Sequence, residues 1–261
     1  MENRNIHLYG RVIVRGDVHA LSGLHIGASK EALGIGDVDL PVIRDARRLP
    51  YIPGSSLKGK MRSQWEKLKG AAQNQQIGRV KGKEVFIHGC DDGNCPVCTI
   101  YGVTGDLAKD APTRLTVRDI SLKPESLDGT TAVLYSEVKW EAAIDRVTSA
   151  ASPRQMERVP AGAVFGPMEL VFSVYGQADH ARVGDVLTGL QLVEDDYLGG
   201  QGSRGSGKVA FHQMSVVLKV GDQYKEETDQ RFSGKTLQEL MAVKADLLKW
   251  IEERIPISGG G

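Results

Sequence analysis

The stretch of sequence that decides the fold runs from Tyr51 to Lys69 and reads YIPGSSLKGKMRSQWEKLK. The Pro-Gly-Ser-Ser segment near its start is typical of a turn that ends on a helix-capping serine. Beyond the turn, apolar residues recur at the spacing of one helical face, namely Leu57, Met61, Trp65 and Leu68. The stretch therefore predicts a turn followed by an amphipathic helix.

Alternating or apolar segments on either side of this helix predict strands over residues 6–14, 85–88, 115–122, 133–140, 164–175 and 209–220. Two further helices are expected, over residues 181–193 and from Thr236, which forms a capping box with Glu239. The polar segment 70–83 is predicted to be a mobile loop. This order of elements indicates an α+β fold, in which helices back one antiparallel sheet.

The composition is that of a globular protein. The chain has 261 residues, of which 41% are hydrophobic and 25% are charged, enough for one large domain or two small ones. No apolar run approaches the length of about 18 residues that a membrane span needs. The first ten residues contain no apolar signal core, and three cysteines make no disulfide framework. These features indicate a cytoplasmic protein without a membrane partner.

The overall charge is balanced, with 33 basic and 33 acidic residues, but its distribution is uneven. Residues 41–84 contain eleven Lys and Arg against three Asp and Glu. One face can therefore attract a polyanion while the remainder of the chain is acidic. Lys58 and Arg62 lie one turn apart near the predicted start of the helix, where free N–H groups favour an anion. The alternative for these two residues is an ordinary solvated basic face.

All three cysteines and one histidine occur within eleven residues, as the pattern H-x-C-x4-C-x2-C of His88, Cys90, Cys95 and Cys98. These residue types and this spacing match a tetrahedral zinc site. Four protein ligands leave no open position, so the zinc is expected to be structural and to stabilise a loop too small for its own core. The alternative is three buried or reactive cysteines near an unrelated histidine.

A glycine-dense loop covers residues 199–207, and Gly202–Lys208 matches the beginning of a nucleotide-binding P-loop. The match fails at Val209, where Ser or Thr would bind magnesium, and the residues that follow are typical of a strand. ATP binding is therefore not expected. Arg204 and Lys208 in this loop are better interpreted as contacts to a phosphate backbone.

The sequence contains no nucleophile motif of the G-x-S-x-G type. His25 occurs in a glycine-flanked loop near two acidic residues, Asp37 and Asp39. A structural histidine and two turn residues are the alternative to a catalytic group.

The segment 141–160 has few residues that could anchor a core and is predicted to be an exposed hairpin or arm. Ile144 and Val147 add apolar positions to this arm, and Arg146 and Arg154 add positive charge.

Several strings together resemble a known family. They are LHIG at 24–27, IGDVDLPVIRD at 35–45, LPYIPGSSLKGKMR at 49–62, the arm segments IDR, PR and ERVP between 144 and 160, and the glycine loop. They resemble the RAMP superfamily of CRISPR systems, and more closely the repeated backbone subunit of the type III-A (Csm) effector complex. The resemblance covers the chain from Leu24 to about Phe211.

This resemblance implies a ferredoxin-like or RRM-like antiparallel core. It implies a single RAMP domain over residues 1–261 that carries two insertions, a lid with the zinc loop at 71–113 and a thumb hairpin at 136–163. It also implies partners: a guide RNA (crRNA), a target RNA, head-to-tail copies of the chain, and other type III subunits. These are the large polymerase- or nuclease-like subunit, the small subunit, and the RAMP subunits at the 5′ and 3′ ends of the guide.

The implied activity is endonucleolytic cleavage of the target RNA at regular intervals, with Mg²⁺ or Mn²⁺, inside the assembled complex. The family's catalytic aspartate falls on Asp39, and the thumb wedge on Ile144 and Val147. The expected RNA-binding residues are His25, Ser55, Ser56, Lys58, Lys60, Arg62, Arg146, Arg154, Arg158, Gly200, Arg204 and Lys208. Because RNA supplies its own 2′-OH nucleophile, one carboxylate suffices for the chemistry.

Two other functions remain open from the sequence. The chain could be a non-catalytic, structural crRNA-binding subunit, which needs no Asp39. It could also be a guide-processing endonuclease of the same superfamily, although such enzymes use histidine-based chemistry and His25 has no obvious partner. A subunit of another type III complex, such as type III-D, is a further possibility.

Overall fold

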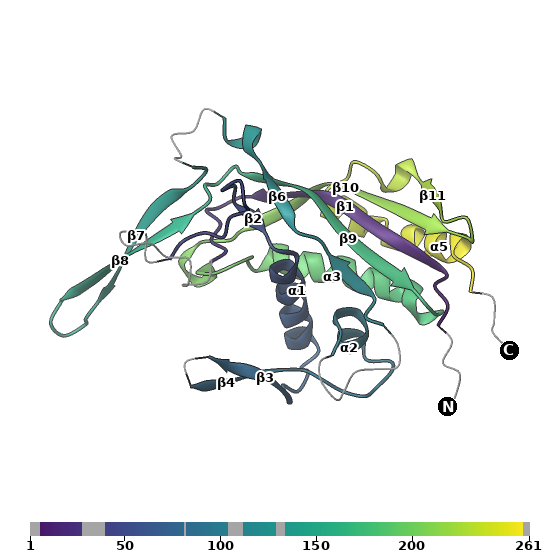
Figure 1. Ribbon diagram of the computed structural model, residues 1–261, viewed down its shortest axis with the longest axis horizontal. Helices are drawn as coiled ribbons and strands as arrows, with labels where there is room; N and C mark the ends of the chain where they lie inside the picture. Colours follow the sequence, from purple (N-terminus) through teal and green to yellow (C-terminus); the bar gives the residue numbers. More distant parts are fainter. Residues whose placement is uncertain (1–5, 28–39, 81, 104–111, 129–133, 258–261) are drawn as a thin grey trace.

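The computed structural model describes residues 6–27, 40–80, 82–103, 112–128 and 134–257. Its centre is a seven-stranded antiparallel sheet in the order β11-β10-β1-β9-β6-β2, with β5 also paired to β9 (Figure 1). The strands of this sheet are β1 (Gly10–Ala20), β2 (Tyr51–Ile52), β5 (Leu115–Val117), β6 (Ile120–Lys123), β9 (Val164–Val174), β10 (Val209–Val220) and β11 (Lys225–Thr228).

The central strand β1 illustrates why the sheet has one covered face. Val12, Val14 and Val18 are at most 1% exposed, whereas Arg11 and Arg15, at odd-numbered positions of the same strand, are only half-buried. Side chains alternate across a strand, so the valines share one face. The expected strand at 6–14 exists but begins later and runs further, because pairing with β10 and β9 continues to the end of β1.

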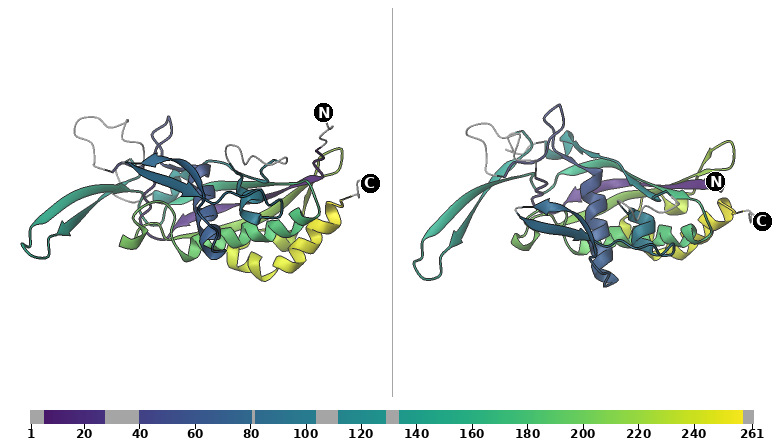
Figure 2. Two further views of the ribbon diagram at one scale, coloured as in Figure 1. Left: turned by 90° about the horizontal axis from the view of Figure 1, so that it is seen from below. Right: turned by 60° about the horizontal axis from the view of Figure 1, so that its bottom comes forward.

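The helices pack on the face that the valines line (Figures 1 and 2). Helix α3 contacts both β9 and β10, and it also contacts α1 and α5. Its buried residues, such as Val183, Leu187 and Leu190, recur at helical spacing. The helices are α1 (Gly54–Leu68), α2 (Pro96–Tyr101), α3 (Ala178–Asp195), α4 (Leu237–Ala242) and α5 (Lys244–Arg254).

The order of the core elements is β1, α1, β5 with β6, β9, α3 and β10. In the sheet, β1 and β9 are central neighbours, and β10 and β6 flank them. Every neighbouring pair is antiparallel. This is the ferredoxin-like arrangement, and the α+β prediction is confirmed.

Helix α1 begins differently from the prediction. Gly54 is already its first residue, Pro53 is the N-cap, and neither serine caps the helix. The Gly54 N–H instead donates a 2.8 Å hydrogen bond to the carboxylate of Asp119, which comes from the turn between β5 and β6. A Cβ atom on Gly54 would lie 2.1 Å from the carbonyl oxygen of Val117, so this close approach requires glycine. The cap was missed because it comes from a distant part of the chain.

Two hairpins extend from the core. One consists of β3 (Gln75–Val80) and β4 (Lys83–Ile87), so the mobile loop predicted over 70–83 is wrong for the second part of the segment, where residues 75–80 pair as a strand. The other consists of β7 (Glu137–Ile144) and β8 (Ala151–Arg158) and projects from one end of the sheet (Figure 1). This hairpin confirms the arm expected over 141–160.

Three smaller features also differ from expectation. Leu68 is 56% exposed and lies off the buried face of α1. The C-terminal helix is divided at Val243 into α4 and α5, and the predicted capping box of Thr236 and Glu239 begins the first of them. Strand β11, which is rich in charged residues, was not predicted.

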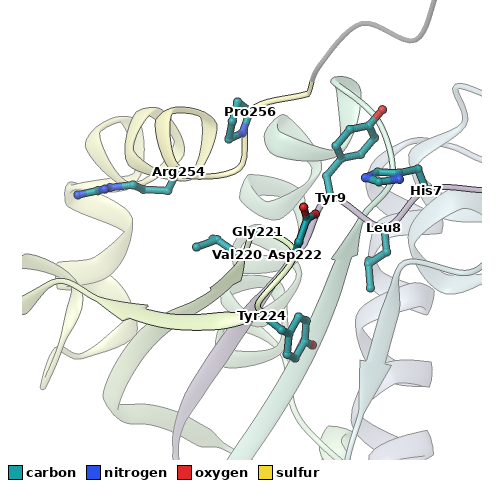
Figure 3. A pocket seen from close by; sticks show the side chains of 9 residues that line it. All are labelled: His7, Leu8, Tyr9, Val220, Gly221, Asp222, Tyr224, Arg254 and Pro256. Carbon is teal, nitrogen blue, oxygen red and sulfur yellow. The ribbon is translucent and has the colours of Figure 1, made fainter.

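The two described ends of the chain meet at the end of the sheet remote from the β7–β8 hairpin (Figure 1). An open pocket of about 490 Å³ lies there, lined by residues 7–9, residues 220–222 with Tyr224, and Arg254 with Pro256 (Figure 3). Within the described residues, no helix is both long and apolar enough to cross a membrane.

Candidate nucleic-acid interface and metal centre

Three segments converge at the base of the β7–β8 hairpin, and we call them the loop junction: residues 23–27, 156–159 and 199–208. Leu24 and Val159 exchange two backbone hydrogen bonds of 2.8 Å. The Gly200 N–H donates to the His25 carbonyl, and the Gly207 N–H donates to the Gly23 carbonyl. The junction thus brings together sequence-predicted residues from the three segments; they are His25, Arg158, Gly200, Arg204 and Lys208.

The backbone of the glycine loop packs directly against the backbone of His25. Gly199 has a φ of +80°, and a Cβ atom there would lie 2.3 Å from the His25 carbonyl oxygen. The imidazole of His25 is 6% exposed, and its Nδ1 lies 2.7 Å from the backbone carbonyl oxygen of Glu157. Because that oxygen can only accept, Nδ1 must be the donor of this hydrogen bond. His25 therefore holds the junction together as well as lining it.

The segment after residue 39 is attached to the same place. Leu40 forms a bridge with Met156, and the Glu157 N–H donates to the Leu40 carbonyl over 3.0 Å. The carboxylate of Glu157 accepts hydrogen bonds from the Val42 N–H and the Arg44 guanidinium. Burial acts to raise the pKa of Glu157, but its hydrogen bonds and the charge of Arg44 outweigh burial and lower it. The predicted catalytic residue Asp39, like Asp37, lies outside the described residues.

One face of the β7–β8 hairpin is apolar and open to solvent. Trp140 is 63% exposed, and Val138 and Ile144 on the same strand are about half exposed. Ala142 opposes Pro153, and Ile144 opposes Ala151, so apolar side chains of both strands share this face. Val147, at the tip, is 92% exposed. An exposed apolar surface of this kind is typical of a binding site.

The opposite face of the hairpin is charged. The carboxylate of Glu141 pairs with Arg154, with Arg204 of the glycine loop, and with Lys139 at 3.4 Å. The Lys139 ammonium also donates to the Arg204 carbonyl. Three cations around one carboxylate leave a net charge of about +2 beside the loop junction. Such a site attracts a phosphate, and it ties the hairpin to the glycine loop.

The tip of the hairpin is closed by Asp145. Its carboxylate accepts hydrogen bonds from the N–H groups of Val147 and Thr148. The predicted phosphate-binding residue Arg146 lies in this exposed turn. Arg158, at the other end of β8, forms a 2.6 Å ion pair with Glu137.

The predicted contacts on helix α1 fall into three groups. The first group lies in the first turns of the helix and consists of Ser55, Ser56 and Lys58. Ser55 is exposed and Ser56 is half-buried, whereas the Lys58 ammonium is already engaged and donates to the Leu115 carbonyl over 2.7 Å. Burial, assisted by the charge of Arg62, lowers the pKa of Lys58. Lys60 lies 3.5 Å from the centre of the Tyr197 ring and pairs with Asp196, which places it beside the glycine loop.

The third group of predicted contacts on α1 is Arg62 alone. Its guanidinium donates to the Glu66 carboxylate and to the backbone carbonyls of His88 and Gly102. The structure therefore places Arg62 against the cysteine cluster rather than at the loop junction. Lys208 lies at the junction, where its ammonium donates to the Glu194 carbonyl.

The four predicted metal ligands converge. One ligand atom from each of His88, Cys90, Cys95 and Cys98 lies within 4.8 Å of all the others. The Cys90 and Cys98 sulfurs are 3.6 Å apart, and the Cys95 sulfur is 3.5 Å from His88 Nε2. Ligand atoms of tetrahedral zinc are spaced by about 3.5–3.8 Å, as follows from Zn–S bonds of about 2.3 Å and Zn–N bonds of about 2.0 Å. The donor set and its spacing fit zinc.

Neighbouring groups orient the His88 ring and lower the pKa of the Cys95 thiol. His88 Nδ1 lies 2.9 Å from the Ala72 carbonyl oxygen, which fixes the proton on Nδ1 and turns Nε2 toward the cysteines. Burial acts to raise the pKa of the Cys95 thiol, but hydrogen bonds from the Cys98 backbone and His88 outweigh it and lower this pKa to about 7. Among the described residues, no second group of three such side chains is close enough to hold a metal ion.

Comparison with known families decides the classification. The family model of the RAMP superfamily matches residues 17–210, more than half of the chain. The chain belongs to the RAMP superfamily. The matched range includes the loop junction, the cysteine cluster and the β7–β8 hairpin, and the resemblance seen in the sequence motifs is confirmed.

Curated relatives of this RAMP chain share one name, CRISPR system Cms endoribonuclease Csm3. The relative from Methanocaldococcus jannaschii is 37% identical over 248 residues, which span 94% of this chain and 96% of the relative. The relative from Methanothermobacter thermautotrophicus is 38% identical over 240 residues, spanning 85% and 92%. The relative from Enterococcus italicus is 36% identical over 221 residues, spanning 82% and 96%.

Solved RAMP structures have the same fold. A chain in the crystal structure of a Csm3–Csm4 subcomplex of the type III-A CRISPR–Cas interference complex aligns with a TM-score of 0.59 and 29% identity, covering 98% of this chain and 100% of that one. The crystal structure of Methanopyrus kandleri Csm3 aligns with a TM-score of 0.59 at 20% identity, covering 93% and 98%. At that identity the second match supports the fold alone.

The sequence did not single out two parts of the site. Trp140 escaped notice because the expected strand ended there, although alternation of Val138, Trp140, Ala142 and Ile144 signals an apolar strand face. Glu157 was cited only within a motif, and its carboxylate contacts depend on tertiary structure.

Proposed function

We propose that the chain is a crRNA-binding filament subunit of a type III CRISPR effector complex, and that it cleaves target RNA complementary to the guide at regular intervals. The observation that carries the proposal is the loop junction, where the glycine loop meets the base of the β7–β8 hairpin and to which the segment after Asp39 is hydrogen-bonded. The shared name of the relatives as CRISPR endoribonucleases supports it.

The guide RNA is held through its backbone. Arg204, Lys208 and Lys60 supply positive charge without reading bases, as a protein that accepts any guide sequence requires, and the glycines allow the RNA backbone to approach closely. Ser55, Ser56 and Lys58 extend this surface onto the first turns of α1. Arg62 is not part of this surface, because its guanidinium is held by Glu66, His88 and Gly102.

The β7–β8 hairpin acts as the thumb that separates bases. Its apolar face, with Ile144 and Trp140, lies against unstacked bases, and Val147 forms the exposed tip. Arg146, Arg154 and Arg158 bind nearby phosphates. The hairpin has an apolar face and a charged face, which suits the separation of bases, because bases contact the apolar face and phosphates the charged one.

Cleavage uses the 2′-OH of the nucleotide next to the scissile phosphate. If the thumb holds that nucleotide so that the hydroxyl is in line with the phosphorus, geometry supplies much of the rate. Asp39 orients the hydroxyl or holds Mg²⁺ or Mn²⁺, which would stabilise charge on the phosphate. The products are then a 2′,3′-cyclic phosphate and a 5′-hydroxyl.

The cysteine cluster holds a structural zinc ion. His88, Cys90, Cys95 and Cys98 fill all four positions, so the ion supplies no chemistry and instead stabilises the segment between β4 and α2.

The complex is cytoplasmic and contains head-to-tail copies of the chain, target RNA and the other type III subunits. The structural neighbour whose title names a Csm3–Csm4 subcomplex supports this type of association.

The experiment is carried out on the assembled complex with Asp39→Ala, and with Asp37→Ala as the matched control. We expect Asp39→Ala to abolish cleavage at every interval and to leave RNA binding unchanged, while Asp37→Ala still cuts. Cleavage by Asp39→Ala would refute the role of Asp39. A wild-type complex that binds target RNA without producing spaced fragments would instead identify a structural, non-catalytic subunit.

A further inference from the structure

Arg62 and Glu66 form an ion pair that is largely withdrawn from solvent. Arg62 Nε donates to Glu66 Oε1 over 2.7 Å, and the two side chains are only 13% and 7% exposed. They lie one turn apart on α1, on the side that faces the cysteine cluster. A pair this buried is costly to form unless further hydrogen bonds satisfy both partners.

Those further hydrogen bonds go to the two ends of the metal-binding segment. Arg62 donates to the carbonyl of His88, the first ligand, over 2.5 Å and to the carbonyl of Gly102 over 2.8 Å. Gly102 is the C-cap of α2, and its N–H donates to the carbonyl of Cys98, the last ligand. One guanidinium thus bridges the start and the end of the segment 88–102.

Glu66 completes the arrangement from the other side. Its Oε1 accepts from the His88 N–H at 3.3 Å, and its Oε2 accepts from the Gln73 side chain at 3.0 Å. The backbone donor and the backbone acceptor of His88 are therefore both held by this pair. The His88 ring is oriented separately by the Ala72 carbonyl.

We infer that Arg62 and Glu66 are positioning residues for the metal centre, which hold the segment 88–102 in the geometry that binds zinc, and that Arg62 is not a phosphate ligand of the guide. The inference rests on the proposed zinc site. It explains why a basic residue within the RNA-binding motif is buried against a carboxylate. Outer contacts of this kind raise metal affinity because they fix ligands before the metal arrives.

The first test measures zinc in the full-length chain without RNA. We expect Arg62→Met and Glu66→Gln to release zinc to a chromogenic chelator at least about tenfold faster than wild type. Arg62→Lys should not restore retention, because one ammonium cannot span two carbonyls and a carboxylate. Arg79→Met removes the exposed Arg79–Glu84 pair on the neighbouring hairpin and is the matched control, with wild-type release.

Glu66→Gln keeps the size of the side chain, so it reports on the pair even if Arg62→Met fails to fold. Wild-type zinc retention in folded Glu66→Gln and Arg62→Lys would overturn the inference. A wild-type chain that binds no zinc would overturn it as well. None of these outcomes depends on RNA, so they are distinct from a failure of the proposed function.

The second test separates positioning from phosphate contact. With zinc in excess, guide-RNA affinity of Arg62→Met and wild type is measured across a series of salt concentrations. We expect parallel plots of log affinity against log salt. A slope reduced by about one unit in Arg62→Met would show a lost phosphate contact and overturn the inference.

Discussion

The backbone N–H of Glu157 donates a 3.0 Å hydrogen bond to the carbonyl of Leu40, which fixes the residue following Asp39 to the base of the β7–β8 hairpin. The carboxylate of the same glutamate holds Val42 and Arg44. The segment that carries the proposed catalytic residue and the proposed thumb therefore form one unit. Any change that loosens Glu157 should affect both.

We predict that Glu157→Gln destabilises the protein by about 1–3 kcal/mol at pH 7, because the half-buried Arg44 loses its charged partner. The pKa of Glu157 is lowered from its ordinary value of 4.5. A lowered pKa in the folded state means that the stabilisation is present above pH 4.5 and is lost as the pH falls through the folded value. The difference between wild type and variant should therefore shrink below about pH 4.5.

Urea unfolding at pH 7 and at lower pH measures this difference. The control is Glu226→Gln, which breaks a solvent-screened pair with Lys219 and should leave the free energy of unfolding close to that of wild type. A difference between Glu157→Gln and wild type that did not change with pH would contradict the assignment of the effect to the carboxylate.

Trp140 should report directly on RNA. It is 63% exposed, whereas Trp65 and Trp250 are at most 6% exposed. We predict that guide and target RNA quench its fluorescence, and that Trp140→Ala weakens RNA binding by about 1–3 kcal/mol, the range for stacking of one base on an aromatic ring. Folding stability should change by less than about 0.5 kcal/mol, because the side chain is exposed.

Trp140→Phe keeps a stacking surface and serves as the control, with binding near that of wild type. If RNA quenches the fluorescence of Trp140→Ala as strongly as that of wild type, the signal does not come from the hairpin face. That result would remove Trp140 from the proposed thumb surface.

Removal of zinc should unfold the segment 88–102 locally. At free zinc about 1,000 times its dissociation constant, bound metal contributes about 4 kcal/mol. We predict that an excess of chelator lowers the melting temperature and opens this segment to limited proteolysis, while the sheet persists. His88→Ala should behave like the chelated protein, and His212→Ala, outside the cluster, should retain zinc by metal analysis.

Lys60 should contribute one phosphate contact beside the glycine loop. We predict that Lys60→Met weakens RNA binding and reduces the dependence of log affinity on log salt by about one unit. Lys249→Met, at an exposed position of α5, should leave both quantities unchanged. Equal slopes for Lys60→Met and wild type would show that its ammonium stays with Asp196 and Tyr197 when RNA binds.

Regular patterns were readable from the sequence. Alternation predicted β9 and β10, helical spacing predicted α1 and α3, and the cysteine spacing predicted the ligand cluster. Each of these signals is local, because it depends on which face of one element is buried or on ligands close together in the chain.

The features of the fold and of the site that could not be predicted depend on contacts between segments that are distant in the sequence. Asp119 caps α1 from 65 residues away, so no local pattern announces it. The basic character of Arg62 suggested an RNA contact, but its partners Gly102 and His88 become visible only when α1 packs beside the cysteine cluster. β3 is exposed and polar, and only pairing with β4 makes it a strand.

The pocket shared by residues 7–9 and 254–256 has a consequence for the topology of the chain (Figure 3). Because the two ends of the described chain meet there, a short linker can join them, and new termini can be opened in an exposed turn. A circular permutant opened in the exposed turn at Gly221 would keep every core pairing from β1 to β10. The hairpin, at the other end of the sheet, would then be free of both fusion points.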